Sequence, residues 1–540
     1  MQWKNYRYKL TEEGAVITQY LPEEEEISAR IPSEIDGYPV TEIGEEAFSE
    51  YGSMLERVEV PSTVKRLGNG AFKMCMSLTD LVLQNGLEYI GEEAFYLTPV
   101  EELYLPESVS EIRRPWELGG IRFRISEENP WFSTDGYGLY RRTGEEDGGE
   151  KELLVIFQSE ERTEYFVEAG TTVIGENAAA GNTVLREVIL PDTVHTIREA
   201  AFEGCQQLEK IFLPEGLRVI EANAFSHCIC LREIHLPASL EYLGEYAVSD
   251  TFGWSESLNG LEEITVDERN PLFHRSGDAL FQNLFDGDER TEKRGRALVK
   301  YFGRDRKYEI PGDVVCILPG AFRRAGIFRA DVPEAVRKVG KDAFRECRNL
   351  GEIYLEESDT LLYIPRQPVY RKDEIMALFC SGDCETYQKE DNDDIALPEK
   401  WLSFARMPIS SGSSKEKENP YEKYAFDYRG YDALFHTYLN LPDQYGMAVC
   451  RLKYPVLLDD DVKAKYETFI RKNLPGILDS IAETQDMDHL VQLAELGFFT
   501  EENIEACMDR FHRPGCAKMM SYLLNYKMQN LGEAEFDFDL

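Results

Sequence analysis

Hydrophobic and polar positions follow one fixed order that returns many times along the chain. Residues 208–228, LEKIFLPEGLRVIEANAFSHC, follow the pattern L-x-x-I-x-L-P-x-x-L-x-x-I-x-x-x-A-F-x-x-C, in which x is variable. The Ala-Phe dipeptide or its remnant occurs at Ala47-Phe48, Ala71-Phe72, Ala94-Phe95, Ala178-Ala179, Ala201-Phe202, Ala224-Phe225, Ala247-Val248, Ala321-Phe322 and Ala343-Phe344. Within uninterrupted blocks these dipeptides are 22–24 residues apart. A constant period of this length is typical of a solenoid built from repeated units.

Each repeat unit predicts two short extended pieces followed by a turn. In Leu208–Leu213, Ile211 and Leu213 share one face of a strand, so the residues that flank Ile211 face the other way. Pro214 ends this strand, because proline cannot donate a ladder hydrogen bond. A second extended piece is expected over Leu217–Ile220, and the A-F-x-x-C stretch is expected to form one turn of helix that buries its Phe and Cys. One unit cannot bury its own apolar face, so neighbouring units are expected to stack.

The repeat resembles a known class of proteins. Its sequence pattern is similar to the BspA-like class of leucine-rich repeats. The opening segments are also similar to the usual N-terminal segment of that class, namely YRYKLTEEGAVITQYL and IPSEIDGYPVTEIGEEAF. The resemblance covers roughly residues 6–357 and rests on about nine units. It implies an α+β repeat fold, a curved leucine-rich-repeat solenoid. It implies little about function beyond binding, because the class is defined by its scaffold.

Two longer segments, at about residues 126–168 and 267–311, interrupt the array and resemble each other. Each contains two alternating apolar runs around a polar, Gly-containing turn, which predicts a β-hairpin. We expect these inserts to brace the side of the solenoid. The corresponding positions are Asn129-Pro130 with Asn270-Pro271, and Tyr165 with Tyr308.

The composition changes after the array, and four parts are predicted. Residues rich in Ser, Gly and charge are typical of a linker, and apolar spacing of 3.6 beyond them predicts a small all-α domain. The parts are a solenoid over 1–375, a linker over 376–420, a helical domain over 421–531 and an acidic tail over 532–540.

Four amphipathic helices are predicted in the helical domain, over residues 459–474, 486–497, 500–512 and 515–530. Asp486 and Thr500 are expected to be N-caps, and Gly497 is expected to end a helix. The second and third helices together resemble a helical pair of the ankyrin or HEAT type.

The charge of the chain restricts its partners. It has 59 basic and 100 acidic residues, a formal net charge of −41. Nucleic acids and anionic membranes require clustered Lys and Arg, so neither is expected as a partner, and a basic or neutral one is favoured. Eleven scattered Cys suit reduced thiols. The opening MQWKNYRYKLTEEG has no apolar core of a signal peptide, and no run reaches the ~18–20 apolar residues of a membrane span, so a cytoplasmic location is expected.

Catalytic and metal-binding motifs are missing from the sequence. The nearest match to a phosphate-binding loop, EAVRKVGKD, has Ala335 where a Gly is required. Cys380 and Cys384 form a C-x-x-x-C without the second ligand pair that a zinc site usually needs. We therefore expect no enzyme, no catalytic residue, no cofactor and no metal. Four other cysteines recur at one repeat position and are expected to pack in the core, namely Cys75, Cys205, Cys228 and Cys347.

The two positions that flank the inward Ile form columns on the outer side of the stacked strands, which lie ~4.8 Å apart. The position after the Ile holds Glu59, Val82, Tyr104, Ile189, Phe212, His235, Thr265, Asp331 and Tyr354. The position before it holds Arg57, Asp80, Glu102, Glu187, Lys210, Glu233, Glu263, Arg329 and Glu352. The first column has apolar and aromatic members and the second is mostly acidic. Exposed apolar rows often mark partner sites, and aromatic residues dominate interface hot spots.

We therefore predict a non-catalytic scaffold that binds a protein or peptide through this strand face. The predicted contact residues are Tyr104, Ile189, Phe212, His235 and Tyr354, with Glu187 and Glu233 selecting a basic partner. Three alternatives stay open. The inserts or the helical domain could fold over the face and bury it. The chain could be a carbohydrate-binding or adhesive surface protein, against which the missing signal peptide counts. An enzyme would require a site assembled across the linker. The oligomeric state is left open.

Overall fold

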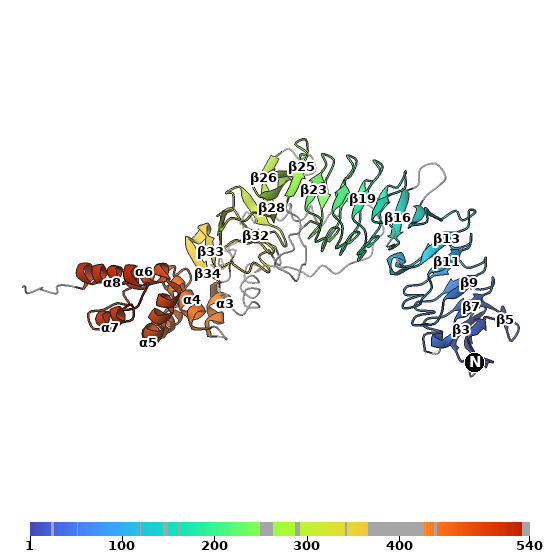
Figure 1. The fold of residues 1–540 in the computed structure, drawn as a ribbon, viewed down its shortest axis with the longest axis horizontal. Helices are drawn as coiled ribbons and strands as arrows, with labels where there is room; N and C mark the ends of the chain where they lie inside the picture. The colour runs from blue at the N-terminus through green and yellow to red at the C-terminus, as the bar shows by residue number, and fades with distance from the viewer. Residues whose placement is uncertain are drawn as a thin grey trace, which may run out of the picture. The chain divides into compact units, whose positions relative to one another are not determined.

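The repeats stack through short parallel strands, which Figure 1 shows side by side along the chain. The computed structural model describes residues 1–540 except 23–25, 51, 119, 144–149, 160–161, 249–262, 287–291, 341–342, 365–425, 427, 437–439 and 532–540. The chain divides into two compact units, 1–275 and 276–540. The predicted α+β solenoid with two hairpin inserts and a helical C-terminal region is confirmed. The predicted linker and acidic tail lie outside the described residues.

The first strand of each repeat, here called a face strand, alternates buried and exposed residues. In β21 (Lys210–Phe212), Ile211 is 7% exposed, while Lys210 and Phe212 face solvent. The face strands of the first unit are β4 (Ser28–Arg30), β7 (Arg57–Val60), β9 (Asp80–Leu83), β11 (Glu102–Leu105), β13 (Arg122–Ile125), β17 (Glu164–Phe166), β19 (Glu187–Ile189), β21, β23 (Glu233–Leu236) and β25 (Glu263–Val266). Those of the second unit are β29 (Lys307–Glu309), β31 (Arg329–Val332) and β33 (Glu352–Leu355), to which β34 (Thr360–Tyr363) adds an antiparallel edge.

A second ladder, formed by the side strands, runs along each unit. The predicted extended piece at Leu217–Ile220 contains one of them, β22 (Val219–Ile220). The N-terminal sheet contains β1 (Gln2–Trp3), β2 (Tyr6–Leu10), β3 (Ala15–Tyr20), β5 (Glu34–Ile35), β6 (Tyr38–Ile43), β8 (Arg66–Leu67), β10 (Tyr89–Ile90) and β12 (Glu111–Ile112). The next sheet contains β14 (Phe132–Thr134), β15 (Gly138–Thr143), β16 (Glu150–Ile156), β18 (Val173–Ile174), β20 (Thr196–Ile197), β22 and β24 (Tyr242–Leu243). The side strands of the second unit are β27 (Ala279–Asp286), β28 (Glu292–Tyr301), β30 (Val314–Ile317) and β32 (Lys338–Val339). Strand β26 (Phe273–Ser276) includes the residues at which the two units are divided.

The Ala-Phe dipeptides form a third line of contacts between repeats. The backbone N–H of Phe202 donates to the carbonyl of Ala224 at 2.9 Å, and that of Phe225 donates to Ala247 at 3.0 Å. The rings of Phe202 and Phe225 stack at 5.5 Å with an interplanar angle of 4°. The rings of Phe72 and Phe95 also stack, at 6.2 Å, as do those of Phe322 and Phe344 at 4.7 Å, whereas Phe48 and Phe72 are tilted by 37° at 4.9 Å. The dipeptide therefore supplies both a hydrogen bond and apolar contact to the next repeat.

The Ala-Phe-x-x-Cys stretch forms hydrogen-bonded turns, so the prediction of a helical turn there is wrong. Ala200, directly before Ala201-Phe202, has a left-handed φ of 54°, which a right-handed helix cannot include. The residue before Ala-Phe is left-handed in most repeats, at Glu46, Gly70, Glu93, Asn177, Ala200, Asn223, Tyr246 and Gly320. The turns that result place Phe202 and Cys205 in the core, as the sequence predicted.

The repeat cysteines join each turn to the preceding one. The thiol of Cys205 donates to the Ala179 carbonyl at 3.1 Å, and that of Cys228 donates to the Phe202 carbonyl at 3.1 Å. Cys75 and Cys347 make the same contact, with the carbonyls of Phe48 at 3.7 Å and Phe322 at 2.8 Å. All four thiols are free and buried, which confirms that these cysteines are core residues.

Both inserts form antiparallel hairpins that continue the side ladder. In the first, β14, β15 and β16 pair antiparallel, and β16 then pairs in parallel with β18. In the second, β27 and β28 are antiparallel, and β28 pairs in parallel with β30. The hairpins therefore extend the side of the solenoid, as expected of bracing elements.

A buried asparagine anchors each insert to the repeat before it. The side-chain amide of Asn129 donates to the carbonyls of Pro106 at 2.9 Å and Val109 at 3.0 Å. Its carbonyl oxygen accepts from the backbone N–H groups of Trp131 and Phe132, both at 2.8 Å. Asn270 makes the same four contacts, with the carbonyls of Pro237 and Leu240 and the N–H groups of Leu272 and Phe273. The Asn-Pro pairs noticed in the sequence are therefore equivalent in structure.

The helical region begins earlier than the amphipathic pattern indicates. Its helices are α3 (Tyr428–Ala433), α4 (Leu441–Lys453), α5 (Asp460–Thr484), α6 (Met487–Glu495), α7 (Ile504–Asp509) and α8 (Ala517–Asn530). Asp486 caps α6 as predicted, accepting from the His489 N–H at 3.1 Å. The prediction that Thr500 is an N-cap is wrong, because α7 starts only at Ile504. The Asn503 side chain instead accepts from the Thr500 N–H at 2.8 Å.

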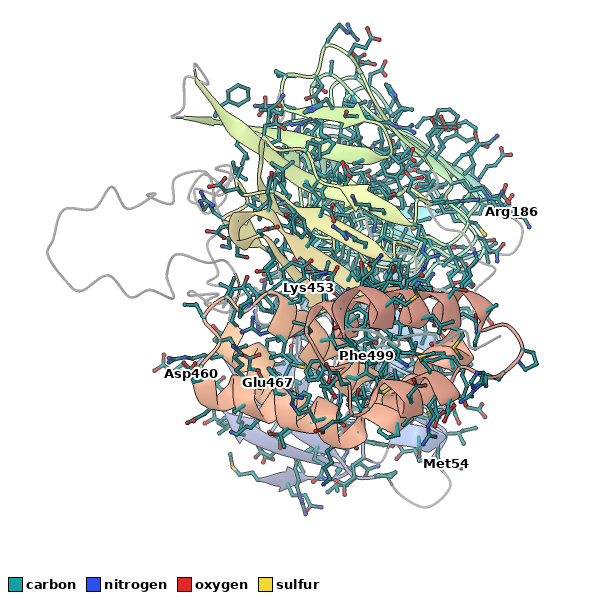
Figure 2. All side chains as sticks on the ribbon, turned by 90° about the vertical axis from the view of Figure 1, so that its left-hand side faces the viewer. Met54, Arg186, Lys453, Asp460, Glu467 and Phe499 are labelled. Atoms are coloured by element: carbon teal, nitrogen blue, oxygen red, sulfur yellow. The ribbon has the colours of Figure 1, made fainter. Side chains whose placement is uncertain are left out.

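The helices close the end of the array through β34. The Tyr363 hydroxyl donates to Asp443 Oδ1 on α4 at 3.0 Å, and the Tyr431 hydroxyl of α3 donates to the Tyr363 carbonyl at 2.6 Å. One hydrophobic core runs from Ala279 to Leu523 and includes both the last repeats and the helices. Figure 2 shows the buried Phe499 among the helices and Asp460 at the exposed start of α5.

A buried ion pair lies inside the helical region. The Arg451 guanidinium donates to both carboxylate oxygens of Asp432, at 2.7 and 2.9 Å, and the Tyr466 hydroxyl donates to the same carboxylate at 2.7 Å. Arg451 also donates to the carbonyls of Tyr454 and Val456. Because every charged group has partners and Arg451 is fully buried, this cluster is a structural element.

The stacked phenyl rings should supply much of the stability of the array. Replacing Phe202 or Phe225 with Ala should lower the free energy of unfolding by ~3–5 kcal/mol, because both side chains are buried. Urea denaturation followed by circular dichroism measures the change. Phe212→Ala is the control, because this exposed ring should cost only about 0.5 kcal/mol. Equal loss of stability in all three variants would contradict the stacking.

The buried thiols should make the array sensitive to alkali. Burial raises the pKa of Cys205 to about 12, whereas a thiol in the unfolded chain titrates near ~8.5. Its contribution to stability is therefore complete below pH ~8.5 and is lost as pH rises towards 12, at about 1.4 kcal/mol per pH unit. Cys205→Ala removes this titration, so the stability difference between parent and variant should shrink above about pH 9. Urea denaturation at several pH values tests this, and a constant difference would contradict it.

Candidate functional site

Three neighbouring face strands present a continuous exposed apolar row. The register pairs Phe166 of β17 with Ile189 of β19, and Ile189 with Phe212 of β21. Phe166 is 54% exposed, Phe212 is 56% exposed and Ile189 is half-buried. The residues between the two outer columns, Tyr165, Val188 and Ile211, point into the core. We call Phe166, Ile189 and Phe212 the apolar row.

His235 continues this face on the next strands. It is exposed on β23 and stands opposite Thr265 of β25, with its Nδ1 atom 2.9 Å from the Thr265 Oγ1 atom. In the neighbouring column, Glu233 stands opposite Glu263. Predicted contact residues Ile189, Phe212 and His235 therefore lie on one face of the first unit.

The other two predicted aromatic residues lie elsewhere. Tyr104 is 51% exposed on β11, in a separate sheet where it pairs with Arg124 of β13. Tyr354 belongs to the second unit, where it is half-buried and its hydroxyl donates to Asp359 Oδ1 at 2.8 Å. This hydrogen bond, and then partial burial, raises the pKa of Tyr354.

Acidic residues flank the apolar row. Glu164, Glu187 and Lys210 stand opposite one another along the column before the inward residue, and Glu233 follows on β23. Within the described part of the chain, no basic group lies within ion-pair distance of these three glutamates. By contrast, Glu102 pairs with Arg124 at 2.6 Å, and Glu263 pairs with Arg275 at 2.8 Å. The column beside the apolar row therefore keeps a net negative charge, three glutamates against one lysine.

The N-terminal face strands differ in character. There the outer positions form ion pairs, such as Arg30 with Glu59 at 2.7 Å and Arg57 with Asp80. Hydrogen bonds from Arg30 and then Arg57 hold the pKa of Glu59 below its usual value. An apolar row beside unpaired acids is thus a local property of the β17–β23 region.

Phe166 and Glu164 were missed by the sequence analysis. Their segment, EYFV, repeats the spacing of the face strand KIFL, but it was assigned to the first insert, which was predicted to extend to residue 168. The structure shows that β17 pairs in parallel with β19 and is a face strand. The matching spacing of EYFV was the signal that could have identified it.

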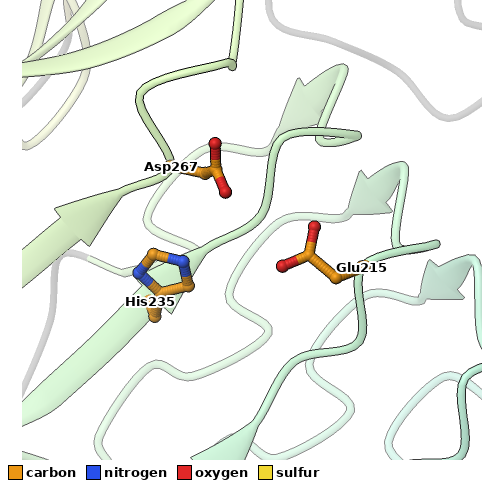
Figure 3. A group of neighbouring side chains, drawn as sticks. All are labelled: Glu215, His235 and Asp267. Atoms are coloured by element: carbon orange, nitrogen blue, oxygen red, sulfur yellow. The ribbon is translucent and has the colours of Figure 1, made fainter.

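A second group of polar side chains lies at the edge of the same face. One ligand atom each of Glu215, His235 and Asp267 lies within 4.8 Å of the other two, and Figure 3 shows the imidazole and carboxylates facing a common space. Arg269 approaches both acids, with Nη2 at 2.8 Å from Asp267 and 3.4 Å from Glu215. This group was not predicted, because its members come from three successive repeats.

Comparison with known proteins identifies the repeats. A family model described as the BspA type leucine-rich repeat region matches in six copies, over residues 31–115, 155–267 and 306–385. No curated protein sequence is significantly similar to the chain. Among the described residues, no helix is both long enough and apolar enough to cross a bilayer.

Several solved structures are similar to parts of the chain. A leucine-rich cell surface protein from Faecalibacterium prausnitzii A2-165 is 22% identical, with 65% of this chain and 75% of that chain covered and a TM-score of 0.31. The pneumococcal vaccine antigen PcpA is 17% identical, with 66% and 93% covered and a TM-score of 0.37. A leucine-rich repeat protein from Eubacterium ventriosum ATCC 27560 is 17% identical, with 64% and 93% covered and a TM-score of 0.40.

The segments matched by the family model cover more than half of the 540 residues and contain most of the face strands. The chain belongs to the BspA type leucine-rich repeat family.

Proposed function

We propose that this chain is a non-catalytic scaffold that binds a protein or peptide through the outer strand face of its first unit. The observation that carries the proposal is the apolar row, in which two phenyl rings and an isoleucine lie in register on solvent-facing strands. Apolar side chains in a row on a wet face often mark a partner site.

The apolar row can supply useful binding energy. Phe buries about 150–250 Å² when fully covered. Covering the exposed halves of Phe166 and Phe212 would therefore gain on the order of 5 kcal/mol at about 25 cal/mol per Å². Part of this gain offsets the entropy lost on association. Additional contacts from the flanking side chains are therefore needed for stable binding.

The flanking charges support a basic partner. Glu164, Glu187 and Glu233 add three unpaired negative charges, and Lys210 adds one positive charge. Such complementarity speeds encounter and selects partners more than it raises affinity. The favoured ligand is a segment with aromatic or aliphatic side chains flanked by Lys or Arg. His235 extends this surface, and Tyr104 and Tyr354 stay predicted contact residues of the strand face.

Peptide selection tests the proposal directly. A random peptide library displayed on phage and selected on the full chain should yield sequences rich in Lys, Arg and apolar residues. Phe212→Ser and Ile189→Ser should each weaken binding of a selected peptide at least tenfold, because truncating a central contact removes more than about 1.4 kcal/mol. Calorimetric titration measures the affinity.

Val82→Ser is the matched control, because Val82 occupies the same strand position on β9, outside the apolar row. It should leave peptide affinity unchanged. Melting temperatures of the Phe212 variant should stay close to the parent, because the ring is exposed. A fall in melting temperature with peptide binding retained would show that the row is internal packing and would reject the proposed function.

The role of the acids has its own test. A variant with Glu164, Glu187 and Glu233 all changed to Gln should bind the selected basic peptide about tenfold more weakly and with a smaller dependence on salt concentration. Glu187→Gln and Glu102→Gln are then compared as single variants that each remove one charge, because Glu102 already pairs with Arg124 whereas Glu187 has no such partner among the described residues. Equal effects of both changes would mean that net charge, rather than the site, governs binding.

A further inference from the structure

Three successive repeats each contribute one metal-ligating side chain to the edge of the strand face. Glu215 follows the Pro that ends β21, His235 lies on β23, and Asp267 directly follows β25. Stacked strands lie ~4.8 Å apart, so side chains from adjacent repeats can meet at this point. The three ligand atoms lie within 4.8 Å of one another, and Figure 3 shows them facing a common space.

The hydrogen bond between His235 and Thr265 favours the imidazole tautomer that can bind a metal. Its Nδ1 atom lies 2.9 Å from the hydroxyl oxygen of Thr265 on the neighbouring strand. When Nδ1–H donates to this hydroxyl, the lone pair is on Nε2, which is the tautomer that coordinates a metal. Metal-ligating histidines almost always donate their other ring N–H to a hydrogen-bond acceptor, usually a carboxylate, a backbone carbonyl or water, and the Thr265 hydroxyl takes this place here. Thr265 would therefore be a positioning residue.

The carboxylates already attract a cation. Asp267 accepts from the backbone N–H of Arg269 at 2.8 Å and from its Nε at 2.9 Å, and Arg269 Nη2 also approaches Glu215. Nη2 of Arg269 donates to the other Asp267 oxygen at 2.8 Å, so both oxygens of this carboxylate face a positive charge. The Arg269 side chain is 72% exposed and can turn into solvent, whereas its backbone contact with Asp267 stays.

We propose that Glu215, His235 and Asp267 bind one divalent transition-metal ion, with Zn²⁺ as the best match, and that Arg269 competes with it. One imidazole nitrogen and two carboxylate oxygens suit Zn²⁺ better than Mg²⁺ or Ca²⁺, which prefer oxygen ligands alone. Three protein ligands leave a coordination position for water or for a group of a bound partner. The site requires no bound peptide and stands independently of the proposed function.

Calorimetric titration of the full chain with Zn²⁺ tests the site. All variants carry Cys380→Ser and Cys384→Ser, so that this pair of thiols cannot contribute. His235→Asn should weaken Zn²⁺ binding at least tenfold, and Thr265→Val should weaken it about 10–100-fold by removing the second partner of the imidazole. Arg269→Ala should tighten binding by about threefold to tenfold, because it removes the competing cation.

Two controls separate this site from adventitious binding. His512→Ala removes an exposed histidine elsewhere in the chain and should leave Zn²⁺ affinity unchanged. Mg²⁺ should give no comparable binding heat. Absorption of the Co²⁺-loaded protein should lack thiolate-to-metal bands and should change in His235→Asn. Equal Zn²⁺ affinity of the parent and His235→Asn, or weaker binding by Arg269→Ala, would overturn the proposal.

Discussion

The stacking of identical turns is the constraint on which the whole structure depends. Each repeat is too small to bury its own apolar side chains, so it must share them with its neighbours. The Ala-Phe dipeptides satisfy this requirement twice, through a backbone hydrogen bond to the next Ala and through ring contact between successive Phe side chains. The cysteine thiols add a contact to the preceding turn. The constant spacing of the repeats in the sequence and the continuous apolar core therefore both follow from the requirement that each turn stacks on the next.

A stacked array leaves an apolar surface at each end, and this chain covers its C-terminal end with helices. β34 turns antiparallel to β33, and α3 and α4 then bind it through tyrosine hydroxyls as well as apolar contacts. The continuous core of the second unit shows why α4 carries buried residues on all sides. These helices protect a sheet edge that would otherwise be open to pairing with other chains.

Much of the fold could be predicted because the buried residues recur at short, regular intervals in the sequence. The alternation around Ile211 predicts the face strand, and the recurring Cys positions predict buried thiols. The helical turn was predicted wrongly, since the left-handed residue before Ala-Phe has no fixed identity and can be Glu, Asn, Gly or Ala.

Other features escaped prediction for reasons that are equally physical. α4 was not predicted, because it is buried nearly all round and so has little exposed polar face, and because Pro442 in its first turn is a typical turn signal. The face strand containing Phe166 was hidden by its place at the end of an insert. The group of Glu215, His235 and Asp267 exists only through stacking, which brings together residues that no local motif connects. The binding roles of the face residues stay predictions.

The two anchoring asparagines have a consequence for how such a chain can grow. Asn129 and Asn270 each join a hairpin to the turn of the preceding repeat through the same four hydrogen bonds, and each hairpin then leads into a new run of side strands. An Asn-Pro hairpin and the repeats that follow it therefore recur in the chain as one unit, which contacts the preceding turn through the same hydrogen bonds each time. Copies could be added or deleted without redesigning the neighbouring core, so the length of the exposed strand face can change while its local geometry is preserved.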